Sequence, residues 1–303
     1  MNKHIVAGRI PTLCILAVFL MAGSGALAQT AFDEAMQQLS SKNVQGYLQP
    51  FVNSTGADMN AGFYHSASIS DFGLYFRFQI VAMGVLIGDN EKYYYATPPQ
   101  SQGYSQQPVR TATVFGDKGA SIQGPAPGLE YQFQNGQFKT AIFPGGVPQL
   151  TIGNVLGTQA TLRYIQLPQI GNIPRTTLAG GGIRHSISRY FPVLPVDVAA
   201  GAFYQRFTFG EYITASAMMI GIQASKSFFI ATVYGGLQYQ ETTMSLNYTI
   251  KGEPPTKVSL DLNSVNHACM TVGLCLNLAV LELNGDVSIG NVTAVSAGLG
   301  FGL

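Results

Sequence analysis

Apolar and polar side chains alternate along much of this chain, and the alternation constrains its fold more than any other feature. From residue 71 to residue 82 the even positions are apolar, and the odd positions include Arg77 and Gln79. The same period of two runs through residues 267–278 and 295–303. Successive side chains of a β-strand point to opposite faces, so each segment predicts a strand with one apolar and one polar face.

The composition indicates which class of strand protein this is. Charged residues make up 10% of the 303 residues, whereas an average soluble protein has about 25%. The formal charge of +1 lacks the basic surplus of a nucleic-acid binder. After residue 28 no apolar stretch reaches the about 20 residues that a transmembrane helix needs. These features together predict a closed barrel whose strands alternate between lipid and lumen.

Residues 1–28 have the layout of an export signal. Lys3 and Arg9 form a basic start, residues 13–21 are an apolar run, and Ala26-Leu27-Ala28 matches the small-residue cleavage pattern. The alternative is an N-terminal membrane anchor, although the apolar run is too short to span a bilayer. Export of a strand-built barrel predicts that the chain resides in the outer membrane of a Gram-negative bacterium.

A helical period precedes the strands. Apolar residues recur at three- and four-residue steps through residues 31–53, which predicts an amphipathic helix. We therefore expect a signal peptide at 1–28, a helical segment or plug at 29–57, and an all-β transmembrane antiparallel barrel at 58–303. At about 9–11 residues for each strand, plus turns, the barrel has room for about 10–14 strands, and we favour about 12.

Several strands can be placed by their alternation. Residues 257–279 are expected to form one strand, interrupted near 263–266. Between 229 and 250 the apolar parity changes at Gln240–Thr243, which predicts a β-bulge or a turn. The proline-rich stretch 93–156 predicts long loops, outside the cell or folded into the lumen. Further strands are expected at 159–167, 177–187, 196–209, 213–225 and 281–290.

The C-terminal alternation has a second implication. Leu299, Phe301 and Leu303 alternate with glycines. This end resembles the terminal strand by which barrel-assembly machinery recognises outer-membrane proteins, although it stops on leucine and not on an aromatic residue. We therefore expect these three residues to be the assembly signal, and we expect that machinery and outer-membrane lipid to be partners of the chain.

The sequence contains none of the usual motifs for catalysis or for metal binding. His65, His185 and His267 lie far apart and lack the spacing of metal ligands. We therefore expect no enzymatic activity, no metal and no cofactor. Cys269 and Cys275 share one face of a strand about 20 Å apart, so we do not expect them to form a disulfide with each other.

Charged side chains that alternate with apolar neighbours are the candidate functional residues. Charge inside hydrocarbon is costly, so these side chains are expected to face the lumen. They either line a polar pore or form an interior network that fills the barrel, and the sequence leaves both interpretations open. The set is Arg77, Arg163, Arg184, Arg206, Lys251, Asp261, Glu282 and Asp286.

Four stretches resemble a family of uncharacterised outer-membrane β-barrel proteins from Gram-negative bacteria. They are PGGVPQLTIG (144–153), ATLRYIQLP (160–168), GGGIRHSISRYFPVLPVDVAAGAFYQ (180–205) and AVSAGLGFGL (294–303). The resemblance implies fold and location and no activity. A more distant likeness in architecture is to long-chain fatty-acid transporters, which carry an N-terminal plug. Two functions stay open: passage of a small or hydrophobic solute, or a structural or surface-interaction barrel with a packed interior and no transport.

Overall fold

The computed structural model describes residues 41–100, 103–171, 173–191, 193–250 and 256–302. The predicted signal peptide, Lys251 and Leu303 lie outside these residues. Among the helices that are described, none has the length and apolar character needed to cross a membrane.

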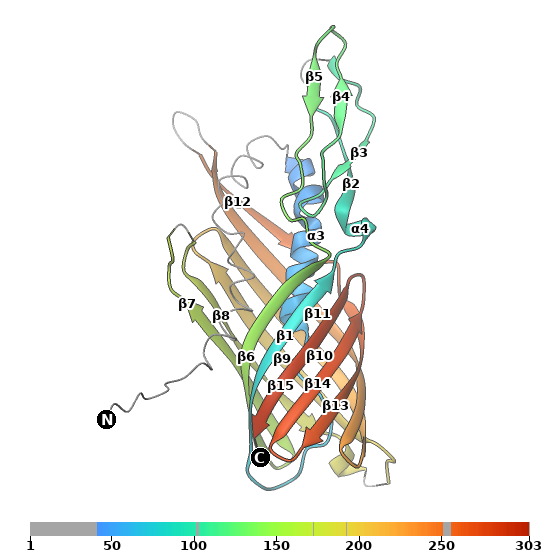
Figure 1. Cartoon of the computed structure of the whole chain (residues 1–303), viewed down its shortest axis with the longest axis vertical. Coiled ribbons are helices and arrows are strands. Elements are labelled where there is room, and N and C mark those ends of the chain that lie inside the picture. Colours follow the sequence, from blue (N-terminus) through green and yellow to red (C-terminus); the bar gives the residue numbers. More distant parts are fainter. Residues whose placement is uncertain (1–40, 101–102, 172, 192, 251–255, 303) are drawn as a thin grey trace, which may run out of the picture.

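Eleven strands form one antiparallel sheet, and ten of them close into a barrel (Figure 1). Pairing of β10 with β11 joins the two ends of the strand order, so the wall is continuous. The eleventh strand, β12 (Thr256–Asn263), pairs with residues 243–250 of β11. The wall consists of β1 (Tyr75–Leu86), β6 (Ile142–Val155), β7 (Thr158–Leu167), β8 (Thr176–Ser186), β9 (Asp197–Phe209), β10 (Ile213–Phe228), β11 (Ala231–Ile250), β13 (Ala268–Leu278), β14 (Leu281–Ile289) and β15 (Thr293–Gly302).

The closed barrel therefore has fewer strands than the twelve that we favoured. One reason is that the strands exceed the minimum that a bilayer needs, and β11 reaches 20 residues. The other is that the chain leaves the wall between β1 and β6. There α4 (Asp89–Lys92) precedes two small hairpins. The hairpins are β2 (Tyr93–Ala96) with β3 (Val109–Ala112) and β4 (Ser121–Gln123) with β5 (Glu130–Gln132).

The two ends of the barrel differ in their connections. The hairpins β2–β3 and β4–β5 stand above one end, which we call the loop end (Figure 1). At the opposite end, the turn end, two-residue turns join β6 to β7, β10 to β11 and β13 to β14. The last strand, β15, also runs towards the turn end, because it pairs antiparallel with β1 and β14.

A helix, α3 (Ser41–Asn60), lies inside the barrel (Figure 1). It continues through Pro50 and ends beyond the predicted boundary at residue 57. At the loop end Asn43 donates to the carbonyl of Thr97 at 2.9 Å. In the interior the carbonyl of Met59 accepts from Arg163. The chain then continues towards the turn end, where β1 begins, and we call residues 41–70 the plug segment.

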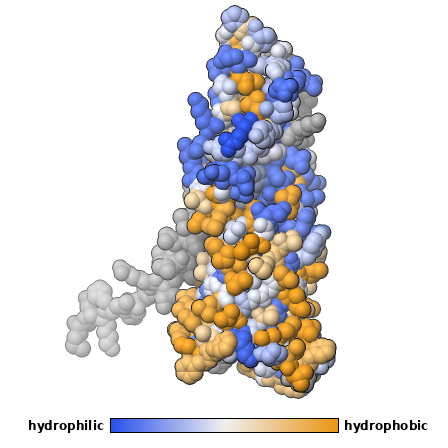
Figure 2. Space-filling model, turned by 90° about the vertical axis from the view of Figure 1, so that its right-hand side faces the viewer, coloured by the Kyte–Doolittle hydropathy of each residue, from blue (hydrophilic) through white to orange (hydrophobic). Residues whose placement is uncertain are grey.

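The polarity of the wall reverses between the two ends. Near the turn end, on β14, Leu283 faces outward and Glu282 is buried inside. Towards the loop end, on β11, Leu246 is buried inside and Thr243 is exposed. Figure 2 shows the outer surface changing from mostly hydrophobic in its lower half to mostly hydrophilic in its upper half. The apolar lower surface is the kind that lipid covers, whereas the upper surface suits water.

This reversal corrects one prediction about β11. The parity change at Gln240–Thr243 is neither a bulge nor a turn, because the register of β11 with β10 continues unbroken through it. Apolar side chains face outward before the change, and Met244 and Leu246 face the plug segment after it. The side chains keep their alternation while the environment on each side of the wall changes.

Other strand predictions are confirmed. The expected interruption near 263–266 is the gap between β12 and β13, which both pair with β11. The strands expected at 159–167, 177–187, 196–209, 213–225 and 281–290 correspond to β7, β8, β9, β10 and β14.

Candidate functional site

The lumen is the candidate functional site, and the structure places five of the predicted charged residues there. Three further residues of the predicted set do not join them. Lys251 lies outside the described residues, and Arg206 and Asp261 are exposed on the outer surface. The five inside the barrel are Arg77, Arg163, Arg184, Glu282 and Asp286.

The prediction for Arg206 and Asp261 was wrong because both lie where the wall is polar outside. On β9 the neighbouring Gln205 is buried inside, so the side chain of Arg206 points outward. On β12 Leu262 is buried, and Asp261 accepts a hydrogen bond from Ser245 at the outer surface. The prediction requires apolar neighbours to face lipid along the whole length of each strand, and near the loop end they face the lumen instead.

A row of hydrogen-bonded side chains runs around part of the lumen. Arg163 Nε donates to Gln149 at 2.8 Å, Gln149 donates to Gln79 at 3.3 Å, and Gln79 donates to Glu282 at 3.0 Å. These residues stand at matching levels on β7, β6, β1 and β14, with Gly300 of β15 between the last two. We call Arg163, Gln149, Gln79 and Glu282 the polar ladder.

Glu282 ends the ladder and ties it to the plug segment. Its carboxylate forms an ion pair with Arg77 and lies 2.9 Å from His65 Nε2. The side chains of Glu282 and His65 are both buried. A buried carboxylate is stable only with such partners, so the contact fixes the lower part of the plug segment against the wall.

Two arginines hold the backbone of the plug segment. Arg163, which is 1% exposed, donates to the carbonyls of Met59 at 3.2 Å and Ala61 at 2.8 Å. The Met59 carbonyl belongs to the last turn of α3, where carbonyls lack partners within the helix and carry partial negative charge. The Arg163 guanidinium supplies it with both a donor and a positive charge. Lower down, Arg184 donates to the carbonyl of Ser66 at 2.7 Å. The guanidinium groups of Arg163 and Arg184 therefore hold the plug segment in the lumen through hydrogen bonds to its backbone.

Towards the loop end an apolar core holds α3. Leu48 and Val52 of the helix are fully buried in one cluster with Val81, Val85 and Leu246 of the wall. Burying a side chain of this size stabilises a fold by about 1.5–3 kcal/mol. The lumen is thus filled by apolar packing in one half and by polar contacts in the other.

Small residues let α3 approach its neighbours closely. A Cβ at Gly46 would lie 2.3 Å from the Tyr94 ring. The Tyr47 hydroxyl donates to the carbonyl of Asn135 at 2.8 Å. These contacts join the upper turns of the helix to the loop-end hairpins.

Some buried polar atoms around the lower half of α3 have no partner within the described part of the chain. They include both carboxylate oxygens of Asp58, the hydroxyls of Ser54 and Thr55, and both amide atoms of Gln205 on β9. Buried polar groups are almost always hydrogen-bonded to protein or to water. Water is the partner that such buried atoms usually have where no protein group reaches them.

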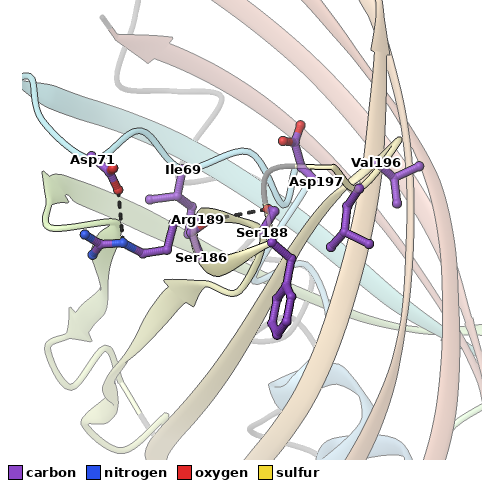
Figure 3. A pocket seen from close by; sticks show the side chains of 9 residues that line it. Ile69, Asp71, Ser186, Ser188, Arg189, Val196 and Asp197 are labelled. Carbon is purple, nitrogen blue, oxygen red and sulfur yellow. Dashed lines mark hydrogen bonds and ion pairs between the residues drawn. The ribbon is translucent and has the colours of Figure 1, made fainter.

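A pocket of about 290 Å³ lies at the turn end (Figure 3). Asp71 and Arg189 form an ion pair of 3.2 Å at its margin, and Ser186 and Ser188 line it. Its nine lining residues include no histidine and no cysteine. The neighbouring His185 is not among them, and its ring nitrogens are hydrogen-bonded to Thr158 and Tyr190.

The chain belongs to a family of unknown function, DUF6588, whose model matches residues 3–303. No curated protein matched the sequence. Among solved structures, the translocator domain of the autotransporter NalP from Neisseria meningitidis is 12% identical, with 93% of this chain and 99% of that chain covered and a TM-score of 0.30. A mutant porin from Rh. blastica is 9% identical, with 76% and 99% covered and a TM-score of 0.20. At these TM-scores the likeness adds nothing to what the strand pairing shows.

Gly300 is needed for the polar ladder, and this leads to a prediction. A Cβ at this position would lie 2.8 Å from Gln79 Cγ, so Gly300→Val should push Gln79 away from Glu282. We expect a loss of about 1–3 kcal/mol in the free energy of unfolding, because a buried polar pair is broken. Denaturant titration in detergent measures it. Gly285→Ala is the control, since a Cβ there meets only Ser296 O at 3.5 Å, and an equal loss in both variants would contradict the prediction.

Proposed function

We propose that this protein is an outer-membrane β-barrel closed by its own plug segment, and that it acts as a surface scaffold and not as an open pore. The observation that supports the proposal is the set of hydrogen bonds from Arg163 and Arg184 to the plug backbone. An open pore would keep these guanidiniums in water. Here each is at most 2% exposed.

The outer surface supports the membrane location. Apolar side chains face outward around the turn-end half of the wall, including Ile220, Leu237, Val272 and Leu283. Such a belt is stable when outer-membrane lipid covers it. Leu299 and Phe301 are also exposed on β15, which suits an assembly signal read by barrel-assembly machinery. We propose both lipid and that machinery as partners.

We expect the protein to fractionate with the outer membrane and to migrate differently on gels before and after boiling, because a closed barrel resists detergent. We also expect the purified full-length chain to be silent in planar bilayers, since the plug segment fills the lumen. Membrane fractionation, gel mobility and current recordings check these outcomes. Recovery from the soluble periplasm would refute the location, and steady wild-type currents would refute the closed state.

Passage of a small solute is the second candidate function. The observation that favours it is the set of buried polar atoms around the lower half of α3 that have no partner within the described residues. Such atoms suit contact with water, and movement of the helix would let water reach them. The likeness to long-chain fatty-acid transporters stays an analogy of architecture. We also propose that the protein is not an enzyme, and the support for this is the absence of a catalytic pattern from the sequence.

A further inference from the structure

We infer that this barrel carries the N-terminal end of its own plug segment to the cell surface. The chain then crosses the outer membrane once more than its ten closed strands account for, and this extra crossing runs through the lumen. The inference rests on the proposed outer-membrane location, and it goes beyond the scaffold function.

The first observation is where the plug segment starts. Asn43 exchanges hydrogen bonds of 2.9 and 3.0 Å with the backbone of Thr97, which follows β2 of the loop-end hairpins. Six residues further along the helix, Gln49 Nε2 donates at 2.8 Å to the carbonyl of Asn263, the last residue of β12. Both partners belong to the loop end, so α3 begins there.

The second observation is where the plug segment ends. The backbone amide of Ala67 donates at 2.9 Å to Ser225 on the part of β10 nearest its turn. Ile69 and Asp71 line the turn-end pocket (Figure 3). Ser70 lies between them in the chain and is exposed. Because α3 starts at the loop end and Ser70 lies at the turn end, residues 41–70 traverse the whole lumen.

The third observation concerns which end faces the outside. Bacterial outer-membrane barrels have short turns on the periplasmic side and longer loops on the cell surface. Here two-residue turns and the end of β15 lie together at the turn end, whereas both hairpins lie at the loop end. The outward residues Glu241, Thr243 and Asn247 near the loop end are polar, which suits a wall that projects into water.

The consequence concerns assembly. An exported chain enters from the periplasm, yet the start of α3 lies at the opposite face. Arg163 and Arg184 hold the plug backbone from within the closed wall, and this suits a wall that closes around the segment during insertion. A sequence fused ahead of Ser41 is then displayed on the cell surface, and the barrel exports its own N-terminal segment.

The test introduces one cysteine at a time into the full-length chain. A membrane-impermeant maleimide is then applied to intact and to permeabilised cells. Gln45→Cys and Ser70→Cys are a matched pair, because both positions are exposed and lie at opposite ends of one plug segment. Tyr95→Cys, at a 73% exposed position of β2, reports the loop end itself. Of the three native cysteines, Cys14 lies in the predicted signal peptide, and Cys269 and Cys275 are buried, so labelling of the parent chain gives the background.

We expect Gln45→Cys and Tyr95→Cys to label equally in intact and in permeabilised cells, and Ser70→Cys to label only after permeabilisation. Labelling of Ser70→Cys in intact cells would overturn the inference. So would protection of Gln45→Cys in intact cells. Heat-modifiable gel mobility shows that each variant is an assembled barrel. A soluble or non-modifiable protein would instead refute the proposed function, so the two failures are distinguishable.

Discussion

Replacing Arg163 with methionine should lower the free energy of unfolding by at least about 3 kcal/mol, because three buried acceptors lose their donor at about 1–3 kcal/mol each. Those acceptors are the carbonyls of Met59 and Ala61 and the side-chain oxygen of Gln149. Methionine keeps an unbranched apolar chain and removes the guanidinium. The measurement is denaturant titration of the detergent-solubilised barrel, followed by gel mobility.

Arg206→Met is the matched control for this variant. Arg206 lies on β9, which β8 separates from the strand of Arg163, and it is exposed on the outer surface. Its replacement should therefore change the stability by no more than about 0.5 kcal/mol. The comparison separates loss of an interior contact from loss of positive charge in general. Equal stability of Arg163→Met and the wild type would mean that the arginine does not hold the plug segment.

The barrel could be predicted because a strand period is a local property. Alternation through 71–82 and 267–278 locates β1 and β13 without knowledge of their neighbours. The strand count could not be predicted in the same way. It depends on how much chain leaves the wall. The proline-rich stretch 93–156 was predicted to form loops, and the hairpins β2–β3 and β4–β5 do lie in it, but the wall strand β6 lies in it as well, so that part of the prediction was wrong.

It was harder to predict which face of each strand points into the lumen. Alternation shows that two faces differ, but it does not show which one faces the lumen. Arg77 and Glu282 were placed correctly because their strands have lipid-like outer surfaces at that level. Arg206 and Asp261 were misplaced because, towards the loop end, the apolar face packs on α3. A second apolar surface inside the barrel cannot be foreseen from strand period alone.

The residues that complete the site were missed for a different reason. Gln79 shares the parity of Arg77 on β1, so its position on the inward face was available as a signal. Gln149 lies in the stretch that was predicted to form loops, so no face was assigned to it. The predicted site includes charged residues alone, so the neutral amides of these glutamines were left out of it. The carbonyls of Met59, Ala61 and Ser66 belong to the backbone, and no sequence pattern records which carbonyl a distant arginine will reach.

Removing residues 41–66 should convert the silent barrel into a conducting one. A wall of about eight strands can be filled by its own side chains, but a wider wall leaves free space. This wall has ten strands, and the plug segment occupies the space that remains. Planar-bilayer recordings of the refolded truncated chain should therefore show steady currents, whereas the full-length chain should show none.

Two controls decide what such currents mean. Heat-modifiable mobility must show that the truncated wall still closes, because removing α3 exposes the inward apolar side chains of Met244 and Leu246 to water. A synthetic peptide with the sequence of residues 41–66 should then restore silence, since it returns the carbonyls that Arg163 and Arg184 bind. A folded, truncated barrel that stays silent would show that the wall closes by itself. In that case the plug segment would have a role in assembly or display, and the second candidate function, solute passage, would lose its support.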